Sequence, residues 1–221
     1  MPLTSMVRTL DNVPKAIFDS VSALKFRNTI IVYLLIEGKD LFPDNWLYVH
    51  SSDLSTGRIT NFRNWSPDLY GESENTILAL EFWCNSEDAM WKQDEKELVE
   101  LAKRDIKKTG LTGDHRILDG KVYRVPKCYP VYKKGYKENL QPVQKWLDTI
   151  SNLYAIGRYG SFKYNNQDHS ILMGILISEN IMKNKNHDLW EVNTDYESYQ
   201  ESTVITKTGL VKEGELNLSL S

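Results

Sequence analysis

Runs of apolar and β-branched residues, separated by turn residues, constrain the fold of this chain most strongly. The segment TIIVYLLI at 29–36 is apolar throughout, which is typical of a strand buried on both faces. Three further segments, at 45–51, 57–65 and 75–84, are rich in aromatic and branched side chains and are separated by Pro, Asp, Ser and Gly. The pattern predicts a mostly antiparallel sheet.

Two helical patterns flank these strands. A short helix is predicted over 13–26, and the segment 86–110 predicts a longer surface helix with one buried stripe. In that longer helix Asp94 and Glu97 are spaced as a capping pair, and Gly110 is placed as the stop. The residues at helical spacing along the stripe are Leu98, Leu101, Ala102, Asp105 and Ile106.

The second half of the chain adds four more elements. The segment 120–132 reads as an extended, Pro-interrupted edge strand, and 137–150 as a helix in spite of Pro142. A short strand is predicted over 152–157, followed by a turn and an apolar helix that begins near Ser170. The order of elements predicts an α+β fold, with a mostly antiparallel mixed sheet, flanking helices and a final strand-turn-helix unit.

Composition narrows the classes of partner. Of 221 residues 41% are hydrophobic, which is ordinary for a globular protein, and the net charge of −3 carries no basic stripe that would indicate nucleic acid. The longest apolar runs are shorter than the roughly 20 residues that a bilayer span needs, and no signal peptide is recognised. Two widely spaced cysteines disfavour a disulfide framework or a zinc site. We expect a soluble, cytoplasmic protein with no metal.

The segment GRYGSFKYNNQDHS, at 157–170, is the least ordinary part of the sequence. It places two glycines, an arginine and three aromatic rings before the apolar helix, whose N-terminus favours an anion or an electron-rich carbonyl. Arg158 adds a fork-shaped donor. The alternative is structural: Asp168 or Ser170 caps a buried helix, the rings pack a core edge and His169 is a structural histidine.

Three segments, in this order, resemble one family of enzymes. They are GRITNFRNWSP at 57–67, RVPKCYPVY at 124–132, and GRYGSFKYNNQDHSILMGILISENI at 157–181. Together they resemble the C-terminal portion of UDP-galactopyranose mutases, especially the eukaryotic type, and of related amine oxidase-like or protoporphyrinogen oxidase-like flavoproteins.

The resemblance implies an FAD-dependent enzyme. In the mutases, reduced FAD acts through its N5 atom as a nucleophile on a UDP-sugar, while the protein supplies orientation and charge. The family fold combines a Rossmann-like FAD domain, a helical domain and a sheet domain that covers the flavin. By this resemblance, residues 1–150 are the sheet and substrate-binding domain, and 151–186 return to the FAD domain. The tail is polar and lacks periodicity, so we expect 187–221 to be a partly disordered C-terminal extension.

The resemblance also implies roles for single residues. Arg58 and Arg158 match two arginines that hold the substrate diphosphate, and Tyr129 and Tyr164 match two tyrosines beside the substrate. No catalytic residue is predicted. The residues that match the flavin-contacting turn are Gly157, Arg158, Asn166, Gln167, Asp168 and Ser170.

The sequence lacks the GxGxxG unit that holds the ADP part of FAD in such proteins. We therefore expect a truncated or split flavoenzyme that uses a separate N-terminal FAD-binding chain as its partner. Three alternatives remain: an amine or protoporphyrinogen-type FAD oxidoreductase fragment of unknown substrate, a non-catalytic module that binds a nucleotide-sugar, and a non-functional remnant. The sequence leaves open whether this chain is an enzyme by itself.

Overall fold

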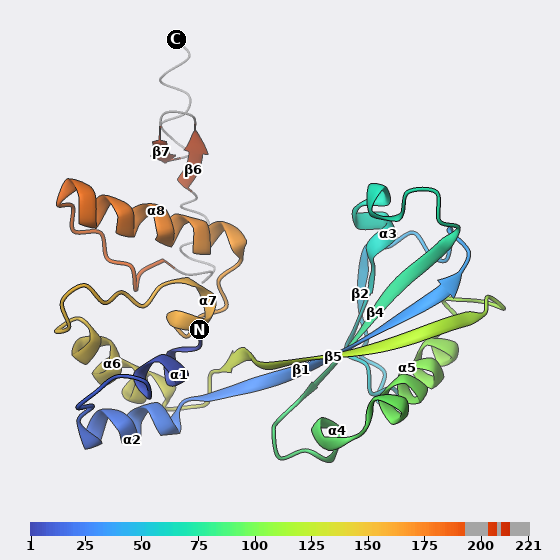
Figure 1. Cartoon of the computed structure of the whole chain (residues 1–221), viewed down its shortest axis with the longest axis horizontal. Coiled ribbons are helices and arrows are strands. Elements are labelled where there is room, and N and C mark those ends of the chain that lie inside the picture. The colour runs from blue at the N-terminus through green and yellow to red at the C-terminus, as the bar shows by residue number, and fades with distance from the viewer. Residues whose placement is uncertain (193–202, 207–208, 213–221) are drawn as a thin grey trace, which may run out of the picture. The chain divides into compact units, whose positions relative to one another are not determined.

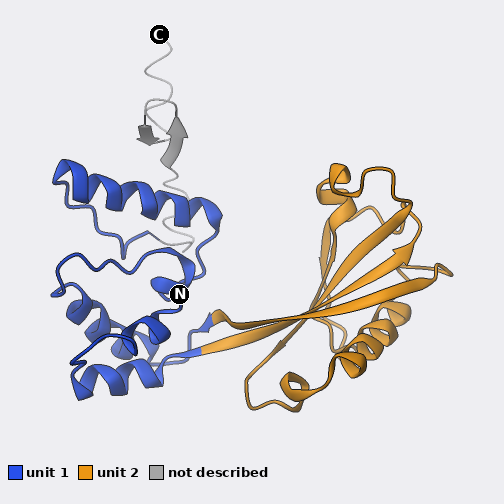
Figure 2. Cartoon of the chain, in the orientation of Figure 1, with its two compact units in different colours: residues 1–25, 130–221 blue, residues 26–129 orange. Residues whose placement is uncertain are grey.

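The computed structural model describes residues 1–192, 203–206 and 209–212. The chain divides into two compact units (Figure 2): unit 1 comprises Met1–Lys25 and Pro130–Ser221, and unit 2 comprises Phe26–Tyr129. The unit boundaries therefore follow the two points where long strands leave the sheet, whereas the sequence interpretation divides the chain near residue 150. The assignment of these segments to a substrate domain and an FAD-domain return stays a prediction.

Unit 2 is built on an open five-stranded antiparallel sheet with the order β2-β3-β4-β1-β5 (Figure 1). This sheet and its flanking helices confirm the predicted α+β class, and β5 is an edge strand as expected. The strands are β1 (Lys25–Glu37), β2 (Trp46–Tyr48), β3 (Arg58–Asn61), β4 (Asn75–Cys84) and β5 (Ile117–Val131).

One face of the sheet forms the core of unit 2. Strands β1 and β4 pair over ten residues, from Asn28↔Cys84 to Glu37↔Asn75, so alternate side chains of both strands point to the same side. On that side Ile30 and Leu80 are fully buried with their apolar neighbours against helix α5 (Glu95–Thr109). The other face of β1 is only half-buried, which corrects the expectation of a strand buried on both faces.

Helix α5 follows the predicted capping chemistry. Asp94 accepts a hydrogen bond from the backbone N–H of Glu97 at 2.8 Å, Glu97 returns the bond, and Gly110 ends the helix with φ 73°. The single helix predicted over 86–110 is nevertheless wrong, because Gln93 is extended and separates α5 from the short helix α4 (Ala89–Lys92). Asp94, the N-cap of α5, is itself extended, as an N-cap residue is, so one helix cannot run through it.

A second correction concerns the segment 57–65. Only Arg58–Asn61 is a strand; the chain then turns into the short helix α3 (Phe62–Trp65), followed by the 3-10 helix η1 (Pro67–Tyr70). The Asn61 side chain accepts a hydrogen bond from the backbone N–H of Arg63, and this local bond competes with continued strand pairing.

Unit 1 is mainly helical, and its described part contains no strand over 152–157, so that prediction is wrong. The apolar helix begins at Gln167, three residues before the predicted start. Its apolar composition indicates a buried helix, but the structure leaves Ile171 and Ile181 exposed, so the helix is buried only in part. Its helices are α1 (Leu3–Val7), α2 (Lys15–Ala23), α6 (Tyr136–Leu147), α7 (Gly157–Gly160) and α8 (Gln167–Lys183).

The predicted C-terminal extension, 187–221, is described only in part. Residues 193–202, 207–208 and 213–221 lie outside the described residues, while β6 (Thr203–Thr206) and β7 (Gly209–Lys212) form an antiparallel pair. Among the described residues, none of the helices combines the length and hydropathy that a membrane span needs.

Candidate functional site

The face of the sheet opposite α5 carries the chemistry of unit 2. The register places Tyr48 beside Arg58, and Arg58 beside Glu81, on one face of strands β2, β3 and β4. Trp83 lies two residues after Glu81 and therefore points to the same side. We call this surface the aromatic face; its residues are Trp46, Tyr48, Arg58, Glu81, Trp83 and Tyr129.

Arg58 and Glu81 form a two-pronged ion pair at the centre of the aromatic face. The Arg58 Nε donates to Glu81 Oε1 at 2.8 Å, and Nη2 donates to Oε2 at 2.7 Å. The side chains are 26% and 10% exposed, so the carboxylate is the more deeply placed partner. Burial lowers the pKa of Arg58, but the hydrogen bonds and charge of Glu81 outweigh burial, and the pKa is raised overall.

Tyr129 joins this pair from the end of β5. Arg58 Nη2 donates to the Tyr129 hydroxyl at 3.2 Å, which brings together two residues that the resemblance implied for the substrate. Burial raises the pKa of the Tyr129 phenol, although the nearby positive charge of Arg58 acts to lower it. The hydroxyl therefore keeps its proton at neutral pH.

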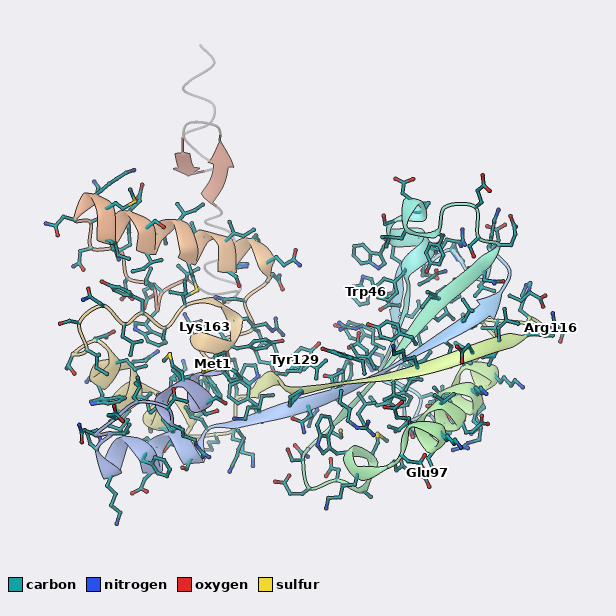
Figure 3. The ribbon with its side chains drawn as sticks, in the orientation of Figure 1. Met1, Trp46, Glu97, Arg116, Tyr129 and Lys163 are labelled. Atoms are coloured by element: carbon teal, nitrogen blue, oxygen red, sulfur yellow. The ribbon has the colours of Figure 1, made fainter. Side chains whose placement is uncertain are left out.

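Aromatic rings surround the ion pair. The Trp83 ring contacts Tyr129 edge-on at a centroid distance of 6.4 Å and lies 6.3 Å from Tyr48. Tyr48 in turn contacts Trp46 at 4.8 Å, and the Arg58 Cζ lies 5.9 Å from the Tyr48 ring. Trp46 and Tyr48 are 42% and 51% exposed, so this surface offers rings to a ligand. Figure 3 labels Trp46 and Tyr129.

The loop before β3 fixes the position of Arg58. Asp105, only 4% exposed on α5, accepts hydrogen bonds from the backbone N–H groups of Ser55 and Thr56 at 2.9 and 2.8 Å. The Thr56 hydroxyl donates to the carbonyls of Arg58 and Glu81. The sequence pattern places Asp105 on the buried stripe of its helix, and this bonding explains how a carboxylate is accommodated there.

Gly57 allows the Trp83 ring to lie against the backbone. A Cβ on Gly57 would overlap the indole, and its nearest atoms would be Cζ3 and Cε3 of Trp83. Neither Trp83 nor Glu81 is among the site residues predicted from the sequence. The signal that could have found Glu81 is a carboxylate inside an otherwise apolar strand segment.

In unit 1 the segment 157–166 forms a tight turn before α8. Gly157 has φ 74°, a left-handed conformation that favours glycine. The Arg158 Nη1 donates to the carbonyls of Tyr164 and Asn165 at 3.1 and 2.9 Å, so this arginine supports the turn. The Tyr164 hydroxyl donates to the carbonyl of Pro130 at 2.6 Å.

The N-terminus of α8 has no side-chain cap. Asn166 occupies the N-cap position without a capping hydrogen bond, while the Ser170 hydroxyl donates back to the Asn166 carbonyl. Asp168 pairs with His169 at 2.9 Å, so neither Asp168 nor Ser170 caps the helix as the structural alternative expected. The first-turn N–H groups of Gln167 and Asp168 have no intrahelical acceptor, which is the normal state of a helix start.

Asn165 lies behind this turn with an unusual bonding pattern. It is 1% exposed, and its Nδ2 donates to the Met173 sulfur and the Val192 carbonyl, each at 3.3 Å. Its Oδ1 is buried and has no hydrogen-bond partner in the described part of the chain. Lys163 Nζ donates to the carbonyls of Trp190 and Val192, so residues 190–192 pack onto the turn.

The structure thus gathers the predicted residues into two groups. Arg58 and Tyr129 belong to unit 2, whereas Arg158 and Tyr164 belong to unit 1 with the predicted cofactor-binding residues Gly157 to Ser170. Within residues 1–192 and the two short described strands, no cluster of three His, Cys, Asp or Glu side chains could hold a metal ion.

The contact of Gly57 with Trp83 gives the first prediction. Gly57→Ala should lower the free energy of unfolding by about 1–3 kcal/mol, because the added methyl overpacks the site and displaces the indole. Thermal unfolding followed by tryptophan fluorescence measures the loss. The matched control is Gly174→Ala in α8, where a Cβ meets nothing within 4 Å. An unfolding midpoint for Gly57→Ala as high as that of Gly174→Ala would contradict the close packing.

The contact of Arg58 with Tyr129 gives the second prediction. Arg58→Gln should raise the pKa of the Tyr129 phenol further, because a positive charge that favours the phenolate is removed. A titration of ¹³C-labelled tyrosine by NMR measures this pKa. Arg116→Gln, at a distant and exposed ion pair with Glu37, should leave it unchanged. A fall in the pKa of Tyr129 in Arg58→Gln would show that Arg58 does not act on this phenol.

Comparisons with known proteins establish the fold. No protein-family model and no curated protein matches the sequence. A crystal structure of reduced UDP-galactopyranose mutase matches with a TM-score of 0.72 and 20% identity, over 90% of this chain and 43% of that chain. A protoporphyrinogen oxidase-like protein from an Exiguobacterium species matches with a TM-score of 0.54 and 17% identity, over 72% of this chain and 35% of that chain.

These two matches share one limit: the chain spans less than half the length of each solved structure. At such low identity the likeness shows the fold alone. The fold of this chain is similar to part of the mutase structure and to part of the protoporphyrinogen oxidase-like structure, in agreement with the resemblance in the three sequence segments.

Proposed function

We propose that this chain is part of an FAD-dependent enzyme that acts on a nucleotide-sugar, as UDP-galactopyranose mutases do. The aromatic face of unit 2 binds the substrate through Arg58 and Tyr129. The turn of unit 1 contacts the flavin through Gly157 and the segment 166–170, and Arg158 and Tyr164 of the same turn are further substrate-binding residues. A segment with a GxGxxG unit, on the same polypeptide or on a partner chain, supplies the remaining FAD contacts.

One observation carries this proposal: a charged, hydrogen-bonded pair lies on an open sheet face among exposed rings. The Arg58 guanidinium is held by Glu81 and Tyr129, so its orientation is fixed before a ligand binds. The flat rings of Tyr48 and Trp83 beside it suit a sugar ring or a nucleobase, each of which offers apolar faces and polar edges. Rings that only pack a core are shielded from water, whereas Trp46 and Tyr48 are exposed. This arrangement therefore resembles a recognition surface more than a packing surface.

The residues of unit 1 are compatible with a flavin edge. The uncapped first turn of α8 provides backbone donors and the positive end of a helix dipole, which suit the electron-rich carbonyls of the ring system. The buried Asn165 Oδ1 has no hydrogen-bond partner among the described residues and can accept a hydrogen bond from a ring N–H. When bound, reduced FAD supplies a nucleophilic N5 atom. The protein residues position the cofactor and stabilise negative charge on it.

The second candidate function is a flavin oxidoreductase of the amine or protoporphyrinogen type. The structural match to a protoporphyrinogen oxidase-like protein favours it, as does a sheet face rich in apolar rings. A third candidate is a module that binds the nucleotide-sugar without catalysis. An oxidoreductase would transfer electrons from its substrate to the flavin, whereas a mutase would not oxidise its substrate. The non-catalytic module would need no flavin.

The substrate half of the proposal predicts a specific loss of affinity. Arg58→Lys keeps the charge but loses the fork that bonds Glu81 and Tyr129, so affinity for UDP-galactose should fall about tenfold. Titration calorimetry measures the dissociation constant. The matched control is Arg116→Lys, which removes an equivalent fork at the exposed pair with Glu37; Figure 3 shows Arg116 at the end of β5 away from Tyr129.

Equal affinities of the two variants for UDP-galactose, at unchanged thermal stability, would show that Arg58 does not bind the substrate.

The proposed flavin binding is tested by co-expression with an FAD-binding chain. The pair should form a yellow complex that is active on UDP-galactose with reduced flavin. Oxygen consumption on amines or porphyrinogens would instead support the oxidoreductase. A colourless but folded pair that binds UDP-galactose would support the non-catalytic module.

A further inference from the structure

A site that binds an anion normally has an excess of positive charge, whereas at the centre of the aromatic face the positive charge of Arg58 is paired with the carboxylate of Glu81. Both strong donors of the Arg58 fork, Nε and Nη2, already bond the carboxylate of Glu81. The second proton of Nη2 is directed to Tyr129. In the described part of the chain, only Nη1 of this guanidinium makes no hydrogen bond to a protein acceptor.

The groups that act on one another here carry no net charge. Arg58 and Glu81 form the ion pair at the centre of this face, and the Tyr129 phenol, to which Arg58 donates a hydrogen bond, is neutral at neutral pH. The positive charge of Arg58 is therefore matched by one carboxylate at 2.7 Å. A diphosphate brought to Arg58 would also approach the carboxylate of Glu81, and the two anions would repel each other.

We infer that Glu81 determines specificity: because of its charge, the aromatic face binds the neutral glycosyl ring of a nucleotide-sugar in preference to the diphosphate. This inference rests on the proposed function and names the part of the substrate that lies at Arg58. It differs from the role that the sequence resemblance implied for Arg58, which was to hold the diphosphate.

The remaining polar atoms fit a hydroxylated ring. The Nη1 group offers two N–H donors, and the carboxylate oxygens of Glu81 each keep a lone pair for a hydroxyl donor. Sugar hydroxyls both donate and accept, so they can satisfy the pair without bringing a charge to it. The rings of Tyr48 and Trp83 can contact the apolar face of the sugar.

The test measures binding of inorganic pyrophosphate and methyl galactoside to the full chain by titration calorimetry at low salt. Glu81→Gln keeps the shape of the side chain but leaves the charge of Arg58 uncompensated. We expect this variant to bind pyrophosphate at least tenfold more tightly than the unchanged protein, while its affinity for methyl galactoside does not rise. The matched control is Glu37→Gln, which frees the exposed Arg116 and should change pyrophosphate affinity less than threefold.

A pyrophosphate affinity of folded Glu81→Gln that is equal to or lower than that of the unchanged protein would overturn the inference. A tenfold gain in Glu37→Gln as well would also overturn it, because the effect would then be one of net charge alone.

Glu81→Gln leaves the Arg58 guanidinium without its carboxylate partner, which can prevent folding. A second variant therefore tests the inference without an unpaired charge. The double variant Arg58→Gln with Glu81→Gln replaces an ion pair by a neutral hydrogen-bonding pair. We expect it to retain the ratio of UDP-galactose to UDP affinity within about threefold. A selective loss of UDP affinity would show that the charge of Arg58 recognises the diphosphate, which would overturn the inference.

Failure of the proposed function gives a different result. If the unchanged protein binds neither UDP-galactose nor methyl galactoside, the nucleotide-sugar function fails. The gain in pyrophosphate affinity in Glu81→Gln uses no nucleotide-sugar, so it is measured independently and reports on Glu81 alone.

Discussion

The antiparallel pairing of β1 with β4 is the constraint on which the rest of unit 2 depends. Because side chains alternate along a strand, this register assigns Leu80 and Phe82 to the core under α5, and Glu81 and Trp83 to the opposite face. A slip of one residue would exchange the two sets and place a carboxylate in the core. The same pairing therefore builds the core and presents the site.

The ion pair on the aromatic face is explained better by recognition than by stability. Removing two charges from water costs about as much free energy as their attraction returns, so such a pair adds little net stability. Its bonding does fix a guanidinium, a carboxylate and a phenol in one arrangement before a ligand arrives. In our proposal this arrangement is what a sugar ring meets. The Asp105 bonds behind it hold the loop that carries Arg58 into place.

The sequence was most informative where local chemistry decides the structure. The strand at 75–84 and the cap formed by Asp94 and Glu97 were predicted because alternation and capping act over a few residues. The strand predicted over 57–65 ends early because the Asn61 side chain bonds the backbone of Arg63 in competition with strand pairing. The strand predicted over 152–157 is absent, and Gly157 at its end adopts a left-handed turn conformation.

The candidate site was predictable only in part for a related reason. The resemblance pointed to Arg58 and Tyr129, and the structure joins them by a hydrogen bond. Glu81 was missed because its importance depends on strand register, which brings it beside Arg58 from 23 residues away. Tyr48 and Trp83 were missed likewise, since aromatic residues in strands are usually packing residues.

The central claim, that the aromatic face binds ligand, is tested most directly by ¹⁹F NMR of the chain labelled with 5-fluorotryptophan and titrated with UDP-galactose. The account predicts that the resonances of Trp46 and Trp83 shift, whereas that of Trp91, which packs against the core, does not. Uniform shifts of all three resonances, or none, would contradict it.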